Sequence, residues 1–74
     1  MSYSEDFKIF VATIYGEAGN SSETAWKVVA HSIKNRIGFN IWAKCSTSTE
    51  VISQTHYDAY DQQTVHYKSA KSDV

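Results

Sequence analysis

The six residues at positions 14–19 read Ile-Tyr-Gly-Glu-Ala-Gly, and they end the most strongly patterned helix that the sequence predicts. Ser4 is a suitable N-cap for this helix, and Gly19 can adopt the left-handed conformation that ends it. Between them, apolar residues recur at the spacing of one helix face: Phe7, Phe10, Val11, Ile14, Tyr15 and Ala18. We therefore predict a helix over about residues 5–18, with Glu17 in its last turn.

Two further helices are predicted from capping signals and apolar spacing. Asn20 and Glu23 have the spacing of a capping box, and the apolar stripe that follows predicts a helix over about residues 21–37. The same capping spacing recurs ahead of a third, short helix near residues 48–54. Because the connection after the first helix is very short, the first two helices are expected to be neighbours, either antiparallel or crossing steeply.

The helical pattern is lost after residue 54. Residues 62–67 are compatible with a short strand or a loose helix, and residues 68–74 are expected to fray. There is no internal repeat or linker, so the prediction is one small, mainly α domain over residues 1–74.

Composition excludes several functions. The chain has 74 residues, a formal net charge of −1 and one cysteine, so it has no internal disulfide and no bulk electrostatic case for binding nucleic acid or an anionic membrane. No apolar run approaches the roughly 20 residues that span a bilayer, and the polar N-terminus does not resemble a signal peptide. The three histidines form no known metal spacing with Cys45, so neither a metal nor a cofactor is predicted.

Glu17 is the best candidate for a catalytic group. A carboxyl group in the last turn of a helix faces the negative end of the helix dipole, and partial burial against aromatic side chains is also expected there. Both effects favour the protonated form that a general acid needs, although a Glu at a helix end is more often simply solvated. Asp58 and Asp61 are candidates for a second, supporting carboxylate. The chain is also rich in aromatic residues, whose exposed faces can stack on flat ligands such as sugar rings, although aromatic side chains in folded chains are mostly buried.

Two segments carry a resemblance to a known family. Residues 12–18 read Ala-Thr-Ile-Tyr-Gly-Glu-Ala, and residues 26–37 read Trp-Lys-Val-Val-Ala-His-Ser-Ile-Lys-Asn-Arg-Ile. Together they resemble the start of the SleB/CwlJ-type cell-wall hydrolases, which are bacterial enzymes that cleave peptidoglycan. The similarity covers about residues 9–37, with a weaker echo at Val51-Ile52-Ser53-Gln54 and Tyr57, and corresponds to the N-terminal part of the longer family domain.

The resemblance implies a lysozyme-like domain or half-domain that cleaves the glycan strand between N-acetylmuramic acid and N-acetylglucosamine. It places the family's catalytic glutamate on Glu17. Under this interpretation, our candidates for substrate binding are Tyr15, Trp26, Tyr57, Asp58 and Tyr60. Hydrolysis and lytic transglycosylation remain alternatives; the second needs no protein nucleophile. Expected partners are the glycan strand and either a second chain that completes the domain or an inhibitor protein. The expected place of action is the bacterial cell wall, reached without a recognisable signal peptide.

Two other functions remain open. The chain could be a non-catalytic module that binds peptidoglycan or a protein, or a small regulatory helical protein that binds nucleic acid. The bulk charge balance argues against the latter.

Overall fold

The computed structural model describes residues 3–19 and 21–74, and within these ranges it contains α-helices, one 3-10 helix and no strand. The elements in chain order are α1 (Glu5–Ala18), α2 (Glu23–Arg36), η1 (Asn40–Trp42), α3 (Ser48–Thr55), α4 (Asp58–Gln62) and α5 (Val65–Asp73). The mainly α fold class is thus confirmed, together with the three helices expected from the sequence.

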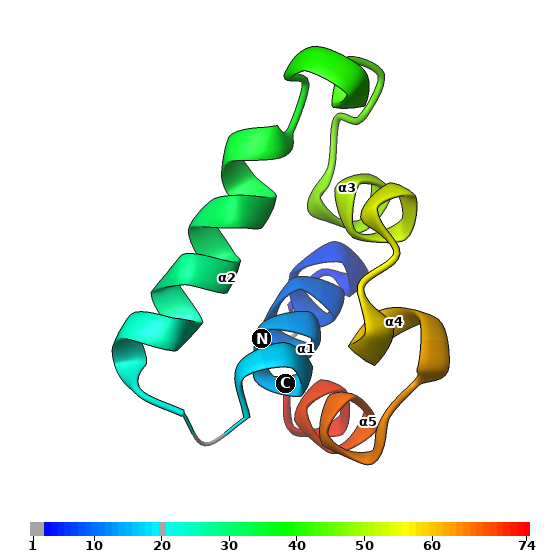
Figure 1. Cartoon of the computed structure of the whole chain (residues 1–74). Helices are drawn as coiled ribbons and strands as arrows, with labels where there is room; N and C mark the ends of the chain where they lie inside the picture. Colours follow the sequence, from blue (N-terminus) through cyan, green and yellow to red (C-terminus); the bar gives the residue numbers. More distant parts are fainter. Residues whose placement is uncertain (1–2, 20) are drawn as a thin grey trace.

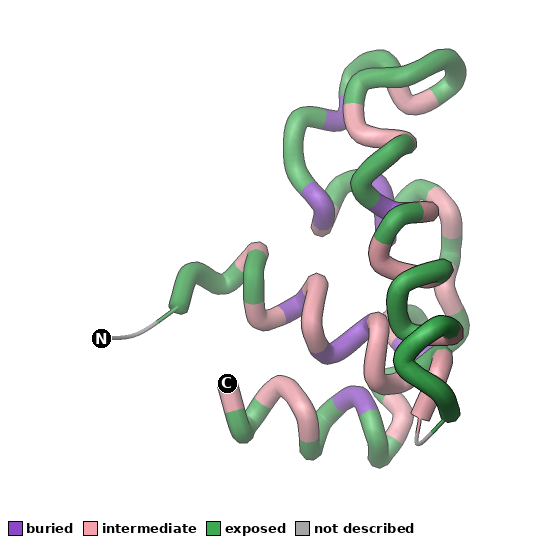
Figure 2. Tube along the Cα trace, turned by 90° about the vertical axis from the view of Figure 1, so that its left-hand side faces the viewer, coloured by how far each residue is buried: buried purple, intermediate pink, exposed green. Residues whose placement is uncertain are grey.

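Helix α1 is the centre of the fold and contacts each of the other four α-helices. Helix α5 lies antiparallel beside it, so that the start of α1 and the end of α5 are on the same side of the molecule (Figure 2). Helix α2 rises steeply from the end of α1, and α3 and α4 cover the remaining side (Figure 1). Of the two arrangements expected for α1 and α2, the structure adopts the steep crossing.

Most helix starts follow the local capping rules. The side chains of Ser4, Thr47 and Thr64 each accept a hydrogen bond from the backbone N–H three residues later. The start of α2 was predicted incorrectly, because its N-cap is Ser22, whose hydroxyl accepts from the Ala25 N–H at 3.3 Å. Asn20, the expected cap, lies outside the described residues.

The C-terminal segment differs from the sequence prediction. Where a strand or loose helix and a frayed end were expected, residues 58–62 and 65–73 form α4 and α5. These helices bury few apolar residues, namely Ala59 in α4 and Tyr67 in α5, so they produce no clear period in the sequence. Their stability comes from packing on α1, which a local pattern does not reveal.

Two small, adjoining clusters form the core around α1, and Tyr60 packs against both of them. One contains Ile9, Ile33, Cys45, Val51 and Ile52, and joins α1 to α2 and α3. The other contains Ala12, Ala59 and Tyr67, and joins α1 to α4 and α5. The inner residues of α1 therefore contribute to both clusters, which explains its central place in Figure 2.

An ion pair ties the end of α5 to the start of α1. Nζ of Lys71 lies 2.6 Å from a carboxylate oxygen of Glu5. The hydrogen bond from Lys71, and then its charge, hold the pKa of Glu5 below its ordinary value. A carboxyl group with a lowered folded-state pKa stabilises the fold above its ordinary pKa, and this contribution is lost as the pH falls through the folded-state value.

We expect Glu5→Gln to reduce the loss of stability on acidification between about pH 6 and about pH 3. Urea unfolding of wild type and variant across this range measures the effect. Lys71→Gln removes the same pair from the other side and should flatten the profile in the same way. Identical pH profiles for wild type and both variants would contradict the assignment.

Candidate functional site

The side chain of Glu17 reaches from the last turn of α1 to the first turn of α4. Its Oε2 accepts a hydrogen bond from the backbone N–H of Ala59 at 2.9 Å. The first N–H groups of a helix have no partner within that helix, and the α4 N-cap residue, Tyr57, provides no side-chain cap. Glu17 therefore caps α4 from a position 42 residues away in sequence.

The surroundings of Glu17 differ from those that the sequence predicted. The side chain is exposed, so the expected partial burial is wrong. The carboxyl group lies near two helix termini, the end of α1 and the start of α4, and the start of α4 donates a backbone hydrogen bond to it. A carboxylate is favoured at a helix start, which offsets its unfavourable position at the end of α1.

Gly16 makes this meeting of α1 and α4 possible. A Cβ atom built on Gly16 would lie 2.5 Å from Cβ of Ala59 and 3.4 Å from Cβ of Tyr67. Contacts of 2.5 Å do not occur between real Cβ atoms, so only glycine permits this approach. Gly16 and Glu17 thus meet the same residue of α4, one by close packing and the other by a hydrogen bond.

Tyr15 and Trp26 come together beside the end of α1. They line a small pocket of about 200 Å³ with Val11 and Ile14. The indole N–H of Trp26 donates to the carbonyl of Gly19 at 2.8 Å, which fixes the ring against the turn between α1 and α2. Two of the expected sugar-contacting residues therefore form one apolar surface.

Tyr57 is half-buried in the turn that precedes α4, and its side chain contacts α2. Its hydroxyl accepts a hydrogen bond from Nη1 of Arg36 at 2.9 Å and lies 3.2 Å from the hydroxyl of Ser32. The guanidinium of Arg36 also lies over the ring of Trp42, with 5.0 Å between Cζ and the ring centroid. These contacts give Tyr57 a part in holding α2 to the rest of the fold.

We expect Tyr57→Phe to lower the free energy of unfolding by about 1 kcal/mol, because the hydroxyl contacts with Arg36 and Ser32 are lost. For a domain of this size that change corresponds to about 4–8 °C in Tm, measurable by thermal unfolding. Tyr3→Phe removes a hydroxyl from an exposed ring and serves as the control, which should unfold like wild type. Equal unfolding of both variants would show that the Tyr57 hydroxyl contributes nothing.

The remaining candidates lie on or beside α4. Asp58 is exposed and directly precedes Ala59, so it belongs to the helix turn that Glu17 caps. Tyr60 is half-buried and packs edge to face on Tyr67, with 6.1 Å between the ring centroids. Asp61 is paired with His56, whose Nδ1 lies 3.0 Å from a carboxylate oxygen. Asp58 and Tyr60 thus flank Ala59 in α4, whereas Asp61 forms a pair with His56.

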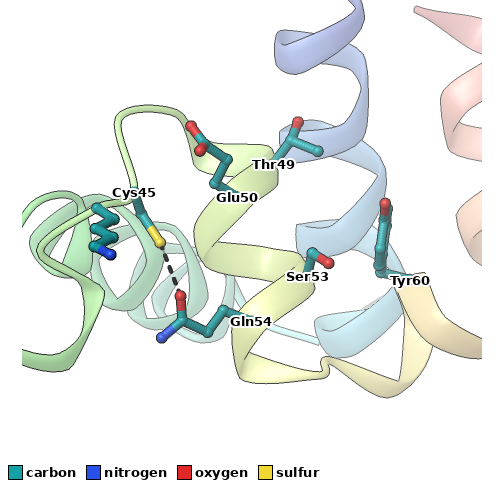
Figure 3. Close-up of a pocket in the computed structure, with 7 residues that line it drawn as sticks. Cys45, Thr49, Glu50, Ser53, Gln54 and Tyr60 are labelled. Atoms are coloured by element: carbon teal, nitrogen blue, oxygen red, sulfur yellow. Dashed lines mark hydrogen bonds between the residues drawn. The ribbon is translucent and has the colours of Figure 1, made fainter.

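Tyr60 also lines a larger pocket of about 450 Å³ that the sequence did not indicate (Figure 3). Its other lining residues are Lys44, Cys45, Thr49, Glu50, Ser53 and Gln54. Cys45 is buried, and its Sγ lies 3.2 Å from Oε1 of Gln54. Hydrogen bonds from Ser46 and Thr47 hold the pKa of Glu50 below its ordinary value, so this carboxylate serves the start of α3. Thr49, Glu50, Ser53 and Gln54 belong to α3, and their spacing matches no sequence motif that would have indicated a pocket.

The fold and site define a small helical domain in which one carboxylate joins the end of one helix to the start of another. Within residues 3–19 and 21–74, no group of three or more potential metal ligands comes together. No helix in the same part of the chain is long and apolar enough to cross a membrane. No family model, curated protein or solved structure matches the chain.

Proposed function

We propose that the chain is a peptidoglycan-degrading glycosidase that cleaves between N-acetylmuramic acid and N-acetylglucosamine, with Glu17 as the general acid. One observation carries the proposal. Oε2 of Glu17 is held by the Ala59 N–H at 2.9 Å, whereas Oε1 has no hydrogen-bond partner among the residues that the structure describes. A general acid needs both a fixed position and an oxygen that can approach the leaving group.

The surroundings of Glu17 support this role. The side chain is exposed, so a polymeric substrate can reach it. The apolar surface formed by Tyr15 and Trp26 lies on α1 and at the start of α2, and aromatic faces of this kind stack on sugar rings. Asp58 precedes Ala59 in the α4 turn that contacts Glu17, and we assign it the support of positive charge in the transition state.

The expected partner is the peptidoglycan glycan strand, and the expected place of action is the bacterial cell wall. A second chain that completes a cleft around Glu17, or an inhibitor protein, is a further expected partner. Both hydrolysis and lytic transglycosylation are compatible with a single positioned carboxyl group. They differ in whether water or the 6-hydroxyl of the sugar attacks the anomeric carbon.

Mass spectrometry of the fragments released from purified peptidoglycan tests the proposal. Wild type should release glycan fragments, and Glu17→Gln should not. Reducing ends in the product identify a hydrolase, and anhydro-sugar ends identify a lytic transglycosylase. Release by Glu17→Gln at the wild-type rate would eliminate Glu17 as the acid.

A second candidate is a non-catalytic module that binds peptidoglycan or a protein. The observation that favours it is that Glu17 already has a structural task as the cap of α4 and lines none of the pockets described above. Such a module should co-sediment with insoluble peptidoglycan and release no fragments. Wild type and Glu17→Gln should then bind equally well.

A further inference from the structure

A cavity of about 340 Å³ lies between the start of α1 and α5, the two helices that run side by side in Figure 2. This volume is within the range of small-molecule sites, roughly 300–1,000 Å³. Its lining residues include Glu5, Lys8, Gln63, Tyr67, Lys68 and Lys71. Tyr67 is 1% exposed and forms the buried floor.

The cavity is separate from the proposed catalytic site. Glu17 is not among its lining residues and follows Lys8 by nine positions along α1. At a rise of 1.5 Å per residue, nine positions correspond to about 14 Å along the helix. A ligand in this cavity is therefore recognised by side chains that take no part in the proposed glycosidase reaction.

The cavity has an excess of two positive charges, because three lysines line it and Glu5 is its one carboxylate. Glu5 is paired with Lys71 at 2.6 Å. Lys71, and more weakly the charge of Lys8, hold the pKa of Glu5 below its ordinary value. Among residues 3–19 and 21–74, Lys8 and Lys68 form no ion pair, side-chain hydrogen bond or cation–π contact. The fold thus leaves two ammonium groups at the cavity without a counter-ion.

The packing of α5 on α1 brings these charges together. Lys68 and Lys71 are three residues apart on α5 and therefore share a helix face. Tyr67 packs with Ala12 of α1 in the same core cluster, which holds this face beside Lys8. Like charges at such short spacing repel each other. A bound anion would relieve this repulsion.

We propose that the cavity binds a phosphate group, held between the ammonium groups of Lys8 and Lys68. A phosphate ester carries about −1.5 to −2 charges at pH 7, which matches the excess of two positive charges. Lysine binds phosphate as a point charge, whereas the planar fork that suits a carboxylate is provided by arginine, which does not line this cavity. A concave wall with charges of one sign also raises the local concentration of the opposite ion.

Isothermal titration calorimetry at pH 7.5 and constant ionic strength tests the proposal with inorganic phosphate, glycerol 3-phosphate and acetate. Both phosphates should bind wild type, and acetate should bind at least about fivefold more weakly, because it carries one charge fewer. Tighter binding of glycerol 3-phosphate identifies an organic phosphate as the ligand, and equal binding identifies the free ion. Lys8→Gln and Lys68→Gln should each lose about fivefold in affinity for phosphate.

Glu5→Gln should change the affinity in the opposite direction. It removes the opposing carboxylate and releases Lys71, so phosphate should bind about fivefold more tightly. A variant that merely misfolds does not gain affinity. Lys44→Gln lowers the net charge by the same amount outside the cavity and should bind like wild type. Glu17→Gln should also bind like wild type, so this test is independent of the glycosidase proposal.

Four outcomes would overturn the proposal. The first is that wild type shows no saturable binding of phosphate. The second is that acetate binds as tightly as phosphate. The third is that Lys44→Gln weakens binding as much as Lys8→Gln, which would indicate attraction by net charge alone. The fourth is that Glu5→Gln, shown to be folded by its unfolding curve, fails to bind phosphate more tightly than wild type.

Discussion

Gly16→Ala should destabilise the protein strongly, although it adds a single methyl group. The new Cβ would meet Cβ of Ala59 at 2.5 Å, and neither atom belongs to a flexible side chain that can move aside. Helices α1 and α4 would have to separate, which weakens the cluster of Ala12, Ala59 and Tyr67. Overpacking of this kind costs typically 1–3 kcal/mol and sometimes more, and alanine regains up to about 1 kcal/mol in helix propensity.

We therefore expect a net loss of roughly 2 kcal/mol, or about 10 °C in Tm, for Gly16→Ala. For a domain this small, that is a large share of the total stability. The measurement is urea and thermal unfolding of the variant against wild type. A change within about 0.5 kcal/mol would show that the close approach of α1 and α4 does not contribute to stability.

The pair Gly16→Ala and Ala59→Gly forms a double-mutant cycle. Ala59→Gly alone should cost about 1 kcal/mol, because glycine disfavours the helix and leaves a small void. In the double variant the methyl group is moved from α4 to α1, so the loss should be clearly smaller than the sum of the two single losses. Gly19→Ala is the control, since Gly19 has a φ of 59° but no atom within 4 Å of its built Cβ. Its loss reflects backbone strain, and Ala59→Gly should not rescue it.

Glu17→Gln should abolish the proposed glycosidase activity while leaving most of the stability intact. The amide cannot donate a proton to the glycosidic oxygen, and loss of general acid catalysis lowers the rate by typically 10²–10⁴-fold. The side-chain carbonyl of glutamine can still accept the hydrogen bond from the Ala59 N–H. The measurements are fragment release from peptidoglycan and the free energy of unfolding of the same preparation.

Glu17→Ala separates the two roles of this side chain. It should lose activity as Glu17→Gln does, and it should also lose about 1 kcal/mol of stability, because the first turn of α4 then lacks its cap. Glu23→Gln makes the same chemical change at another exposed glutamate and should retain full activity. Full activity in Glu17→Gln, with reduced stability in Glu17→Ala, would leave Glu17 with only its structural role. Absence of fragments from wild type itself would favour the non-catalytic module.

The helices predicted well are those whose signals are local. Helix α1 was predicted over about 5–18 and is observed over Glu5–Ala18, because its apolar stripe lies within it and its caps, Ser4 and Gly19, directly flank it. Helix α3 was also predicted well, because its cap at Thr47 directly precedes it. The start of α2 was misassigned because residues 20–22 offered several capping side chains in a row, and Ser22 is the one that accepts the hydrogen bond.

The C-terminal helices and the turn at residues 38–44 depend on contacts that the sequence pattern does not show. Helix α5 buries Tyr67 against α1, and a single large residue defines no period. Phe39 and Ile41 are exposed, whereas Trp42 packs against the core and its indole N–H donates to the hydroxyl of Thr55, and the run of apolar residues in the sequence does not show this difference. A hydrophobicity pattern cannot predict which of these neighbours is buried, because burial depends on which side chain finds a partner in the folded chain.

By itself, the sequence determined that this is a small helical protein, where its first and third helices lie, and that Glu17 stands at a helix end beside a glycine. The tertiary structure alone decided what these two residues do. The partner of both is Ala59, 42 residues beyond Glu17 and in a helix too short to leave a periodic signal. Helix periodicity and capping act over a few residues, whereas this contact exists only after α4 has packed on α1.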